Sequence, residues 1–405
     1  MRVMVGLGGQ GSNSAHLRQF NERVILTALR RLGEASKADL ARVANLTNNT
    51  AGQIVRELED QRLVRPVGKR TGSRGQPATL LCLNPEGAYA IGVKLGRRSV
   101  DALLVDFGGE VVGRRHRERP FPLPDEALDL VLGEVGALMA MVPEGREDGL
   151  AGLGLAIPYN LGSWARELGL SRAASEAWNT FDLGAHVRRA LRMPVFVEND
   201  GTAVAVAELF QGHGRQLDDF ACVYIGTATG GGLVLGGQYR RGPTGNAADI
   251  GLMPTGPSRL ATAPLPKGQL DILLNRASIA ALIRHLHGNG VVVHGRDELE
   301  AAIAANGDLV GEWLDDCIDA LVAPLMAMAR LLDVTAIVVD GDLPRELVGR
   351  IIAGLEPRLA AAAPESRPPP ELRQGTVGPG AAAMGAALLP LHLNYSPSHE
   401  LLIGH

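Results

Sequence analysis

The sequence has few cysteines, few aromatic residues and no long apolar run. Only Cys82, Cys222 and Cys317 occur among 405 residues, and their wide spacing suggests neither a metal knuckle nor a disulfide framework. No apolar run approaches the roughly 20 residues of a membrane-spanning helix, and the glycine-rich N-terminus lacks the apolar stretch of a signal peptide. We therefore expect a cytoplasmic protein.

The composition is otherwise that of a globular chain with two or three domains, since 46% of residues are hydrophobic and 21% are charged. The net charge of −4 conceals an asymmetry. Residues 1–85 contain 13 Lys and Arg against 6 Asp and Glu, whereas the remainder contains 27 against 38. A basic segment on an acidic body is typical of a nucleic-acid-binding module, although a solvated basic face would give the same composition.

Residues 20–61 have the pattern of three helices. An apolar face at helical spacing runs over residues 24–32 and ends at Gly33. Ser36 and Asp39 open a second helix as a capping box, with Asp39 in the place where Glu or Gln is usual. A tight turn at residues 45–47 leads into a third helix over residues 48–61, whose N-terminal end is polar. This arrangement predicts a helix that reads base edges in a major groove.

Two short strands, residues 63–65 and 79–83, enclose a basic, glycine-rich stretch over residues 68–77. This stretch predicts a wing that follows phosphates or enters a minor groove. Three helices alone would also suit a protein-interaction module, but the basic wing favours DNA. The candidate DNA contacts are Thr47, Asn48, Asn49, Thr50, Gln53, Arg56, Lys69, Arg70, Arg74 and Gln76.

The rest of the chain repeats one plan. Its first half predicts strands over residues 90–95, 99–105, 110–115, 153–157 and 195–197, with helices over residues 125–141 and 183–191. Its second half predicts strands over residues 221–225, 232–235 and 336–340, with helices over residues 278–287, 299–305, 313–332 and 381–389. The repetition indicates a duplicated α/β body with a cleft between its halves.

Polar residues gather where we expect that cleft. Asn199 and Asp200 stand between a strand and a helix, the position at which ligands bind in α/β sheets, although Asp200 could simply cap the helix. The turn over residues 226–232 is rich in Gly and Thr, whose amides and hydroxyls can hold phosphate or sugar oxygens, although many such turns are plain hairpins. Asp249 follows in another glycine-containing loop.

Five segments together resemble the ROK family, in particular its transcriptional regulators of the xylose- and N-acetylglucosamine-repressor type. The segments are residues 154–158, 198–208, 226–232, 333–341 and 383–387, and the resemblance covers about residues 20–390. It implies an α/β chain with an N-terminal winged helix-turn-helix and a duplicated, two-lobed body of the actin-like, sugar-kinase-like (ribonuclease H-like) type.

The resemblance also implies partners and site residues. The partners are a double-stranded DNA operator, a sugar or sugar-derivative effector, and a second copy of the chain in a homodimer or dimer of dimers. The implied sugar contacts are Asn199, Asp200, Asp249, Gly226 and Thr227, and Asp200 takes the position of the general base in the kinase members.

The sequence departs from the family's kinases at three places. Lys94 stands where those kinases have the Asp that places metal and γ-phosphate, and Arg97 replaces a glycine, so that Mg·ATP would be poorly held. Leu252 replaces a His that contacts sugar and zinc, and residues 253–270 contain no cysteine for the family's zinc loop. We therefore expect no enzyme activity, no zinc and no ATP cofactor.

These patterns predict a DNA-binding regulator, in the first instance a repressor, of carbohydrate-metabolism genes that senses a sugar in the cleft. Two alternatives stay open: an active ATP-dependent sugar kinase with a regulatory head, and a ligand-independent regulator controlled by a partner. The expected domains are a tail over residues 1–19, the winged helix over 20–85, two lobes over 86–200 and 201–390, and a tail over 391–405.

Overall fold

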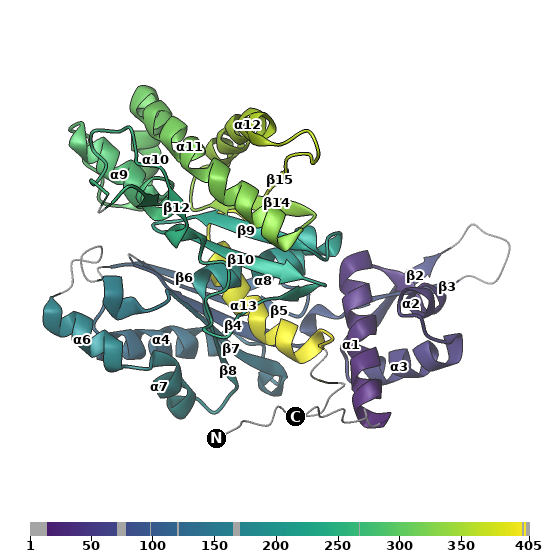
Figure 1. The fold of residues 1–405 in the computed structure, drawn as a ribbon. Coiled ribbons are helices and arrows are strands. Elements are labelled where there is room, and N and C mark those ends of the chain that lie inside the picture. The colour runs from purple at the N-terminus through teal and green to yellow at the C-terminus, as the bar shows by residue number, and fades with distance from the viewer. Residues whose placement is uncertain are drawn as a thin grey trace, which may run out of the picture.

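The computed structural model describes residues 14–70, 78–97, 99–119, 121–164, 171–266, 268–398 and 401. An N-terminal unit of three helices and a small sheet lies beside a body built on two five-stranded sheets (Figure 1). Within the described ranges, none of the helices combines the length and apolarity that crossing a bilayer requires.

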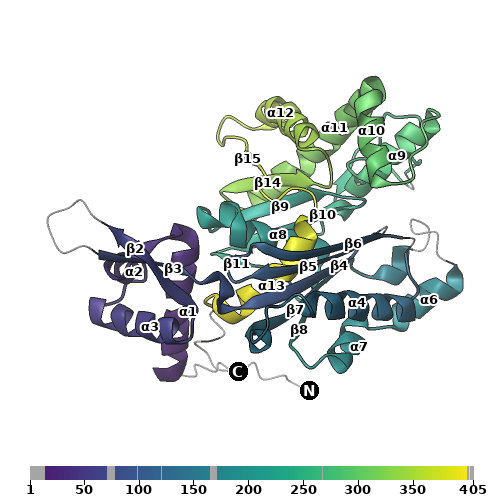
Figure 2. The same ribbon diagram turned by 180° about the vertical axis from the view of Figure 1, so that it is seen from behind.

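The N-terminal unit contains α1 (Ser14–Leu32), α2 (Lys37–Val43) and α3 (Asn48–Asp60). Its antiparallel sheet has the order β1-β3-β2, formed by β1 (Ala35–Ser36), β2 (Val64–Arg70) and β3 (Ala78–Leu83). The hairpin β2–β3 lies on the side of the unit that faces away from the body (Figures 1 and 2).

Short polar side chains set the helix starts in this unit. The capping box at α2 is confirmed, since the amide of Asp39 donates to Ser36 Oγ over 3.2 Å and the amide of Ser36 donates to Asp39 Oδ2 over 3.1 Å. Thr47 caps α3 by accepting a hydrogen bond from the amide of Thr50. Helix α1 begins at Ser14, earlier than the boundary expected at residue 20. The earlier start could not be predicted from the sequence, because the first turns of the helix are polar and carry no apolar periodicity.

The first sheet of the body has the order β6-β5-β4-β7-β8. Its strands are β4 (Tyr89–Leu95), β5 (Ser99–Asp106), β6 (Val111–Glu118), β7 (Leu150–Ile157) and β8 (Val195–Asn199). Strands β4, β7 and β8 run parallel, and β5 and β6 form an antiparallel meander at one edge. The helices α4 (Pro124–Met139), α6 (Arg172–Thr180) and α7 (Leu183–Ala190) pack on the outer face of this sheet.

The second sheet has the equivalent order β11-β10-β9-β14-β15, so the predicted repetition of the plan holds at the level of topology. Its strands are β9 (Phe220–Ile225), β10 (Thr229–Leu235), β11 (Gln238–Tyr239), β14 (Ala336–Gly341) and β15 (Glu371–Gln374). The helices of its outer layer are α9 (Ile279–Gly288), α10 (Arg296–Ala305), α11 (Gly307–Leu332) and α12 (Arg345–Ala362). A small two-stranded sheet joins β12 (Pro254–Thr255) to β13 (Asp271–Ile272).

Helices α8 (Asp200–Gln211) and α13 (Ala381–Tyr395) pack against each other between the two sheets (Figure 2). Glycine makes this close packing possible: a Cβ on Gly92 or Gly154 would overlap the backbone of α13, and a Cβ on Gly385 would overlap the backbone of α8. Helix α13 continues past residue 390, where we expected a tail, because its last turn is buried against the N-terminal unit.

One buried apolar cluster joins the N-terminal unit to the body. Ile25 and Leu29 of α1 belong to the same cluster as Phe107, Phe210 and Leu391 of the body. Helix α1 is therefore part of a continuous core, and its position is coupled to the positions of α8 and α13.

Candidate functional site

A cavity of about 160 Å³ lies at the carboxyl end of β8, with walls from both halves of the body. Its polar lining residues are Arg97, Tyr159, Asn160, Asn199, Asp200, Thr229, Asn246 and Asp249. The structure therefore brings Asn199, Asp200 and Asp249 together at one cavity, as the sequence predicted. Leu252, in the short turn Ile250–Leu252, adds an apolar wall.

The start of α8 fixes Asn199 and Asp200. Asn199 is the cap of the helix, and its Oδ1 accepts a hydrogen bond of 2.8 Å from the amide of Gly201. Asp200 Oδ1 accepts from the same amide over 2.9 Å, so the cap is shared and Asp200 still reaches the cavity. A Cβ on Gly201 would overlap the backbone of Gly231, so only glycine lets the helix start lie against β10. Two acceptor side chains are thus held at a helix N-terminus, which favours negative charge.

Asp249 lies across the cavity in an irregular loop. Asn246 Nδ2 donates to Asp249 Oδ2 over 2.7 Å. Burial raises the pKa of Asp249, the hydrogen bond from Asn246 opposes that rise, and the charge of Asp200 adds to it. Ala248, which also lines the cavity, adopts a left-handed φ of 59°, a strained conformation for a residue with a Cβ.

The sequence-based prediction missed two asparagines of this site. Asn160 follows Pro158 at the end of β7 and has a left-handed φ of 51°. Asn246 was missed although it stands close to Asp249 in a Gly-Asn sequence, which is a common turn signal. Both side chains offer a donor and an acceptor, the pair that a hydroxyl group requires.

Gly226 and Thr227 lie in a neighbouring cavity of about 80 Å³ that shares Asp200 with the first. The glycine-rich turn is shorter than expected, because residues 229–232 belong to strand β10. Residues 229–232 pair with β9, and a Cβ on Gly232 would overlap Gly201 and Ala205 of α8. The glycines of this segment are therefore needed for packing, whether or not the segment also contacts a ligand.

Lys94 occupies the second cavity from the side of the first sheet. Its Nζ lies 3.4 Å from Oδ2 of Asp342, which follows β14, so the ion pair joins the two sheets. Tyr224 Oη donates to Asp342 Oδ1 over 2.7 Å, and the amide of Gly380 donates to the same oxygen over 3.1 Å.

The pKa directions fit a charged pair. Burial by itself lowers the pKa of Lys94, but attraction by Asp342, Asp200 and Asp101 outweighs it and raises that pKa. Burial alone raises the pKa of Asp342, but Lys94, Tyr224 and the amide of Gly380 lower it overall. The ammonium of Lys94 is therefore stabilised by the charges of several carboxylates, those of Asp342, Asp200 and Asp101.

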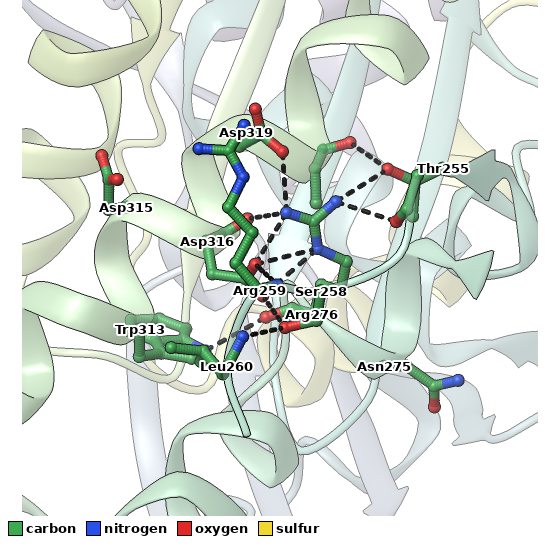
Figure 3. Close-up of polar contacts among 12 residues, drawn as sticks. Thr255, Ser258, Arg259, Leu260, Asn275, Arg276, Trp313, Asp315, Asp316 and Asp319 are labelled. Carbon is green, nitrogen blue, oxygen red and sulfur yellow. Dashed lines mark hydrogen bonds and ion pairs between the residues drawn. The ribbon is translucent and has the colours of Figure 1, made fainter. Parts of the chain in front are cut away.

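A buried ion-pair network supports the loop that follows the cavity wall (Figure 3). Arg276 Nη2 lies 2.7 Å from Asp316 Oδ1 and 2.8 Å from Asp319 Oδ2, and Nη1 donates to the carbonyl of Gly256 over 2.9 Å. Ser258 Oγ donates to Asp316 Oδ2 over 2.8 Å. Arg276 and Asp316 thus fasten the start of this loop, at Gly256 and Ser258. Across the described ranges, no group of three or more His, Cys, Asp or Glu could hold a metal ion.

A second candidate surface lies on the N-terminal unit. The exposed candidate DNA contacts are Thr47, Asn48, Asn49, Gln53, Arg56, Lys69 and Arg70. Thr50 is half-buried, because its amide and hydroxyl both contact Thr47 Oγ1. Arg70 Nη1 donates to Asp39 Oδ2 over 3.0 Å, which holds the turn end of β2 against α2. Arg74 and Gln76 lie outside the described residues.

Comparison with known proteins places these features in one family. The chain is 23% identical to the xylose repressor of Bacillus subtilis over 60% of this chain and 62% of that protein, so the match spans less than two thirds of the repressor. A crystal structure of a ROK-family transcriptional regulator, a homologue of the Escherichia coli Mlc protein, matches 96% of this chain and 98% of its own, with a TM-score of 0.67 and 23% identity.

The body also has the fold of sugar kinases. A ROK-family glucokinase from Streptomyces griseus, solved with glucose and AMPPNP, matches 75% of this chain and 99% of its own, with a TM-score of 0.56 and 24% identity. The ROK family model itself matches residues 90–392, which is most of the chain. The chain therefore belongs to the ROK family.

Proposed function

We propose that this protein is a transcriptional regulator that binds an operator through its N-terminal unit and responds to a sugar bound in the cleft. One observation carries the proposal: the polar N-terminal end of α3 and the basic hairpin β2–β3 share the exposed side of a unit whose other side packs on a sugar-kinase-like body.

The order of helices and strands in the N-terminal unit supports our proposal that it is a winged helix-turn-helix. Helix α3 buries Ala51, Ile54, Val55 and Leu58 and leaves Asn48, Asn49, Gln53 and Arg56 exposed. Asn and Gln pair with adenine, and Arg with guanine, in a major groove. Lys69 and Arg70 lie at the end of β2, and we propose that they, together with Arg74 and Gln76 of the sequence-predicted wing, contact phosphates or the minor groove.

Two such units would read two half-sites. Recognition helices of a dimer on DNA lie about 34–36 Å apart, one helical turn. We therefore propose that the chain acts as a homodimer or a dimer of dimers on a repeated operator. The distance between the heads then depends on the body, to which α1 is fixed by the shared core.

The cleft offers the groups that a monosaccharide requires. Asn160, Asn199, Asp200, Asn246 and Asp249 provide donors and acceptors around one cavity of about 160 Å³. Vicinal hydroxyls bind such pairs, and Gly226 and Thr227 extend the site toward Lys94. Carboxylates removed from bulk water favour a hydroxyl or water partner, which supports a site filled by ligand.

Lys94 argues against phosphoryl transfer. Kinases of this fold stabilise the transferred phosphate with metal and oriented carboxylates. Here the ammonium of Lys94 holds Asp342 at 3.4 Å, which favours a site without Mg²⁺. One observation favours the alternative of an active kinase: a cavity of about 600 Å³, lined by Thr227, His287 and Arg296, adjoins Lys94 and has room for a nucleotide.

The DNA-binding role is tested by selecting duplexes from a randomised pool with the purified full chain. We expect a repeated motif to emerge, and Arg56→Ala to weaken binding of that motif by about 1–3 kcal/mol, the usual discrimination of one base contact. Arg172→Ala, which removes an exposed arginine of α6 far from the N-terminal unit, is the matched control. Equal affinity for all duplexes at physiological salt would contradict specific recognition.

The kinase alternative is tested by incubation with ATP, Mg²⁺ and a panel of hexoses and pentoses. We expect no sugar-dependent ADP release. Turnover that disappears in Asp200→Asn would establish the kinase. If specific DNA binding holds but no sugar binds, the remaining alternative of a partner-controlled regulator becomes the better account.

A further inference from the structure

A separate cavity, of about 180 Å³, lies where the N-terminal unit meets the body. Residues from both sides line it: Thr27, Arg30 and Arg31 from α1, Arg215 from the short turn His213–Arg215, Gln238 from β11, and His392 from α13. It shares no lining residue with the cavities at Asp200. Figures 1 and 2 both show the end of α13 beside α1 at this junction.

Arg30 is the unusual residue of this cavity. Its side chain is buried, with 7% of the residue exposed, yet neither Nε nor Nη2 has a hydrogen-bond partner among the described residues. The guanidinium lies 3.7 Å from the ring centroid of Phe210 and 5.6 Å from that of Phe107. Aromatic faces offset part of the cost of a buried cation, but they use none of its N–H donors.

The junction is rich in positive charge. Arg30, Arg31 and Arg215 all line the cavity. Asp218 is the acidic residue among the described lining residues, and it is already paired, because its Oδ1 lies 2.5 Å from Nη2 of Arg31. Burial and the nearby charge of Arg215 together lower the pKa of Arg30 to about 9. Burial, Arg30 and Arg23 together lower the pKa of His392 to about 4, so that this imidazole is neutral at pH 7.

The unpartnered donors have a defined geometry. Nε–H and Nη2–H lie on one edge of a guanidinium and form the planar fork that binds two oxygens of a carboxylate or phosphate. Thr27 Oγ1, which is also buried without a hydrogen-bond partner among the described residues, lines the same cavity. A water molecule takes about 30 Å³ of liquid volume, so the cavity has room for an oxoanion with a small organic group.

We propose that this junction binds a small oxoanion, a phosphate group or a carboxylate, on the free edge of Arg30 with Thr27 as a further donor. The anion would neutralise a buried charge and connect α1 to α8 and α13 through one ligand. If the N-terminal unit reads DNA, as proposed above, occupancy of this cavity also biases the position of that unit.

The test is calorimetric titration of the full chain with inorganic phosphate, sulfate or acetate, with ionic strength held constant by chloride. We expect saturable binding of at least one of the three oxoanions, weakened at least tenfold by Arg30→Met and a few-fold by Thr27→Val. Arg172→Met, at an exposed arginine of α6, should bind as the wild type does. Binding of phosphate and sulfate without acetate identifies a phosphate-type ligand, and binding of acetate identifies a carboxylate.

Thermal unfolding provides a second readout, because the stabilities of the wild type and Arg30→Met can be compared without any added oxoanion. In chloride alone, Arg30→Met should melt at or above the wild-type temperature, because it removes an unpaired buried charge. At the same concentration, the oxoanion should raise the melting temperature of the wild type and raise that of Arg30→Met much less. Equal responses of the two proteins, or no heat with any of the three anions, would overturn the proposal. Neither result depends on whether the protein binds DNA or sugar.

Discussion

The ion pair between Lys94 and Asp342 links the two sheets of the body, and its removal should be costly. In Lys94→Met, Asp342 keeps its hydrogen bonds from Tyr224 and Gly380 but loses its cation, and 24% of its side chain is exposed. Removal of one partner of a buried pair typically costs about 3–5 kcal/mol. Because Asp342 is partly hydrated and keeps two donors, we expect a loss of about 2–4 kcal/mol.

The assay is urea unfolding of the wild type, Lys94→Met, Asp342→Asn and the double variant at pH 7. The double variant should be more stable than the sum of the two single losses predicts, by at least about 1 kcal/mol, because it leaves no uncompensated charge. Lys94→Arg, which keeps a cation, serves as the control and should lose less than Lys94→Met.

The pH dependence has a definite sign. In the wild type the folded-state pKa of Asp342 is lowered, so its contribution to stability is present above the unfolded-state pKa and is lost as pH falls through the folded-state pKa. The difference between wild type and Lys94→Met should therefore be full at pH 7 and shrink on acidification below about pH 4. A Lys94→Met protein whose free energy of unfolding lies within about 0.5 kcal/mol of the wild-type value, the range of an ordinary surface substitution, would refute this reasoning.

Three further results are expected. Arg276→Met should lower the free energy of unfolding in urea by about 3–5 kcal/mol, since it leaves Asp316 buried without its cation. The control Arg358→Met, which breaks an exposed pair with Asp315, should lower it by about 0–1 kcal/mol, and equal losses would contradict the role of the Arg276 network. Sugar affinity measured by calorimetry should fall on acidification, because protonation of Asp249 removes a hydrogen-bond acceptor, and the fall should begin at a higher pH than an ordinary Asp would give, because burial raises the pKa of Asp249. A wild-type affinity that does not change with pH, and is equally constant in Asp249→Asn, would argue against contact between Asp249 and the sugar. Lys69→Ala should reduce the slope of log affinity against log salt by about 1 without changing the preferred sequence, and an unchanged slope would remove Lys69 from the phosphate contacts.

Local signals in the sequence predicted much of the fold. Apolar runs and caps located α3, the strands of both sheets other than β11 and β15, and the junction of β8 and α8, because each depends on residues that are close in sequence. Helix α12 was missed, since Gly349, Gly354 and Pro357 interrupt its helical pattern. Strand β15 has four residues and lies at a sheet edge, where no apolar alternation is needed.

The candidate site was predicted in part for the same reason. Asn199 and Asp200 follow a recognisable strand end, but the partner of Lys94 is 248 positions away and carries no local signal. The burial of Arg30 could not be predicted from the sequence either, because a charged residue in a surface helix is ordinarily exposed. Burial of that side chain depends on contacts of α1 with Phe107 and Phe210, which only the tertiary structure brings together.

The most direct test of the account is the affinity of the full chain for its selected operator, measured by fluorescence anisotropy with and without a sugar that binds the cleft. We predict that saturating sugar changes operator affinity by about 5–150-fold, a coupling of about 1–3 kcal/mol. Asp200→Ala should abolish this response and leave sugar-free DNA binding intact, because Asp200 lies in the cleft and not on the N-terminal unit. An operator affinity that is the same with and without every sugar that binds the wild type would contradict the central claim.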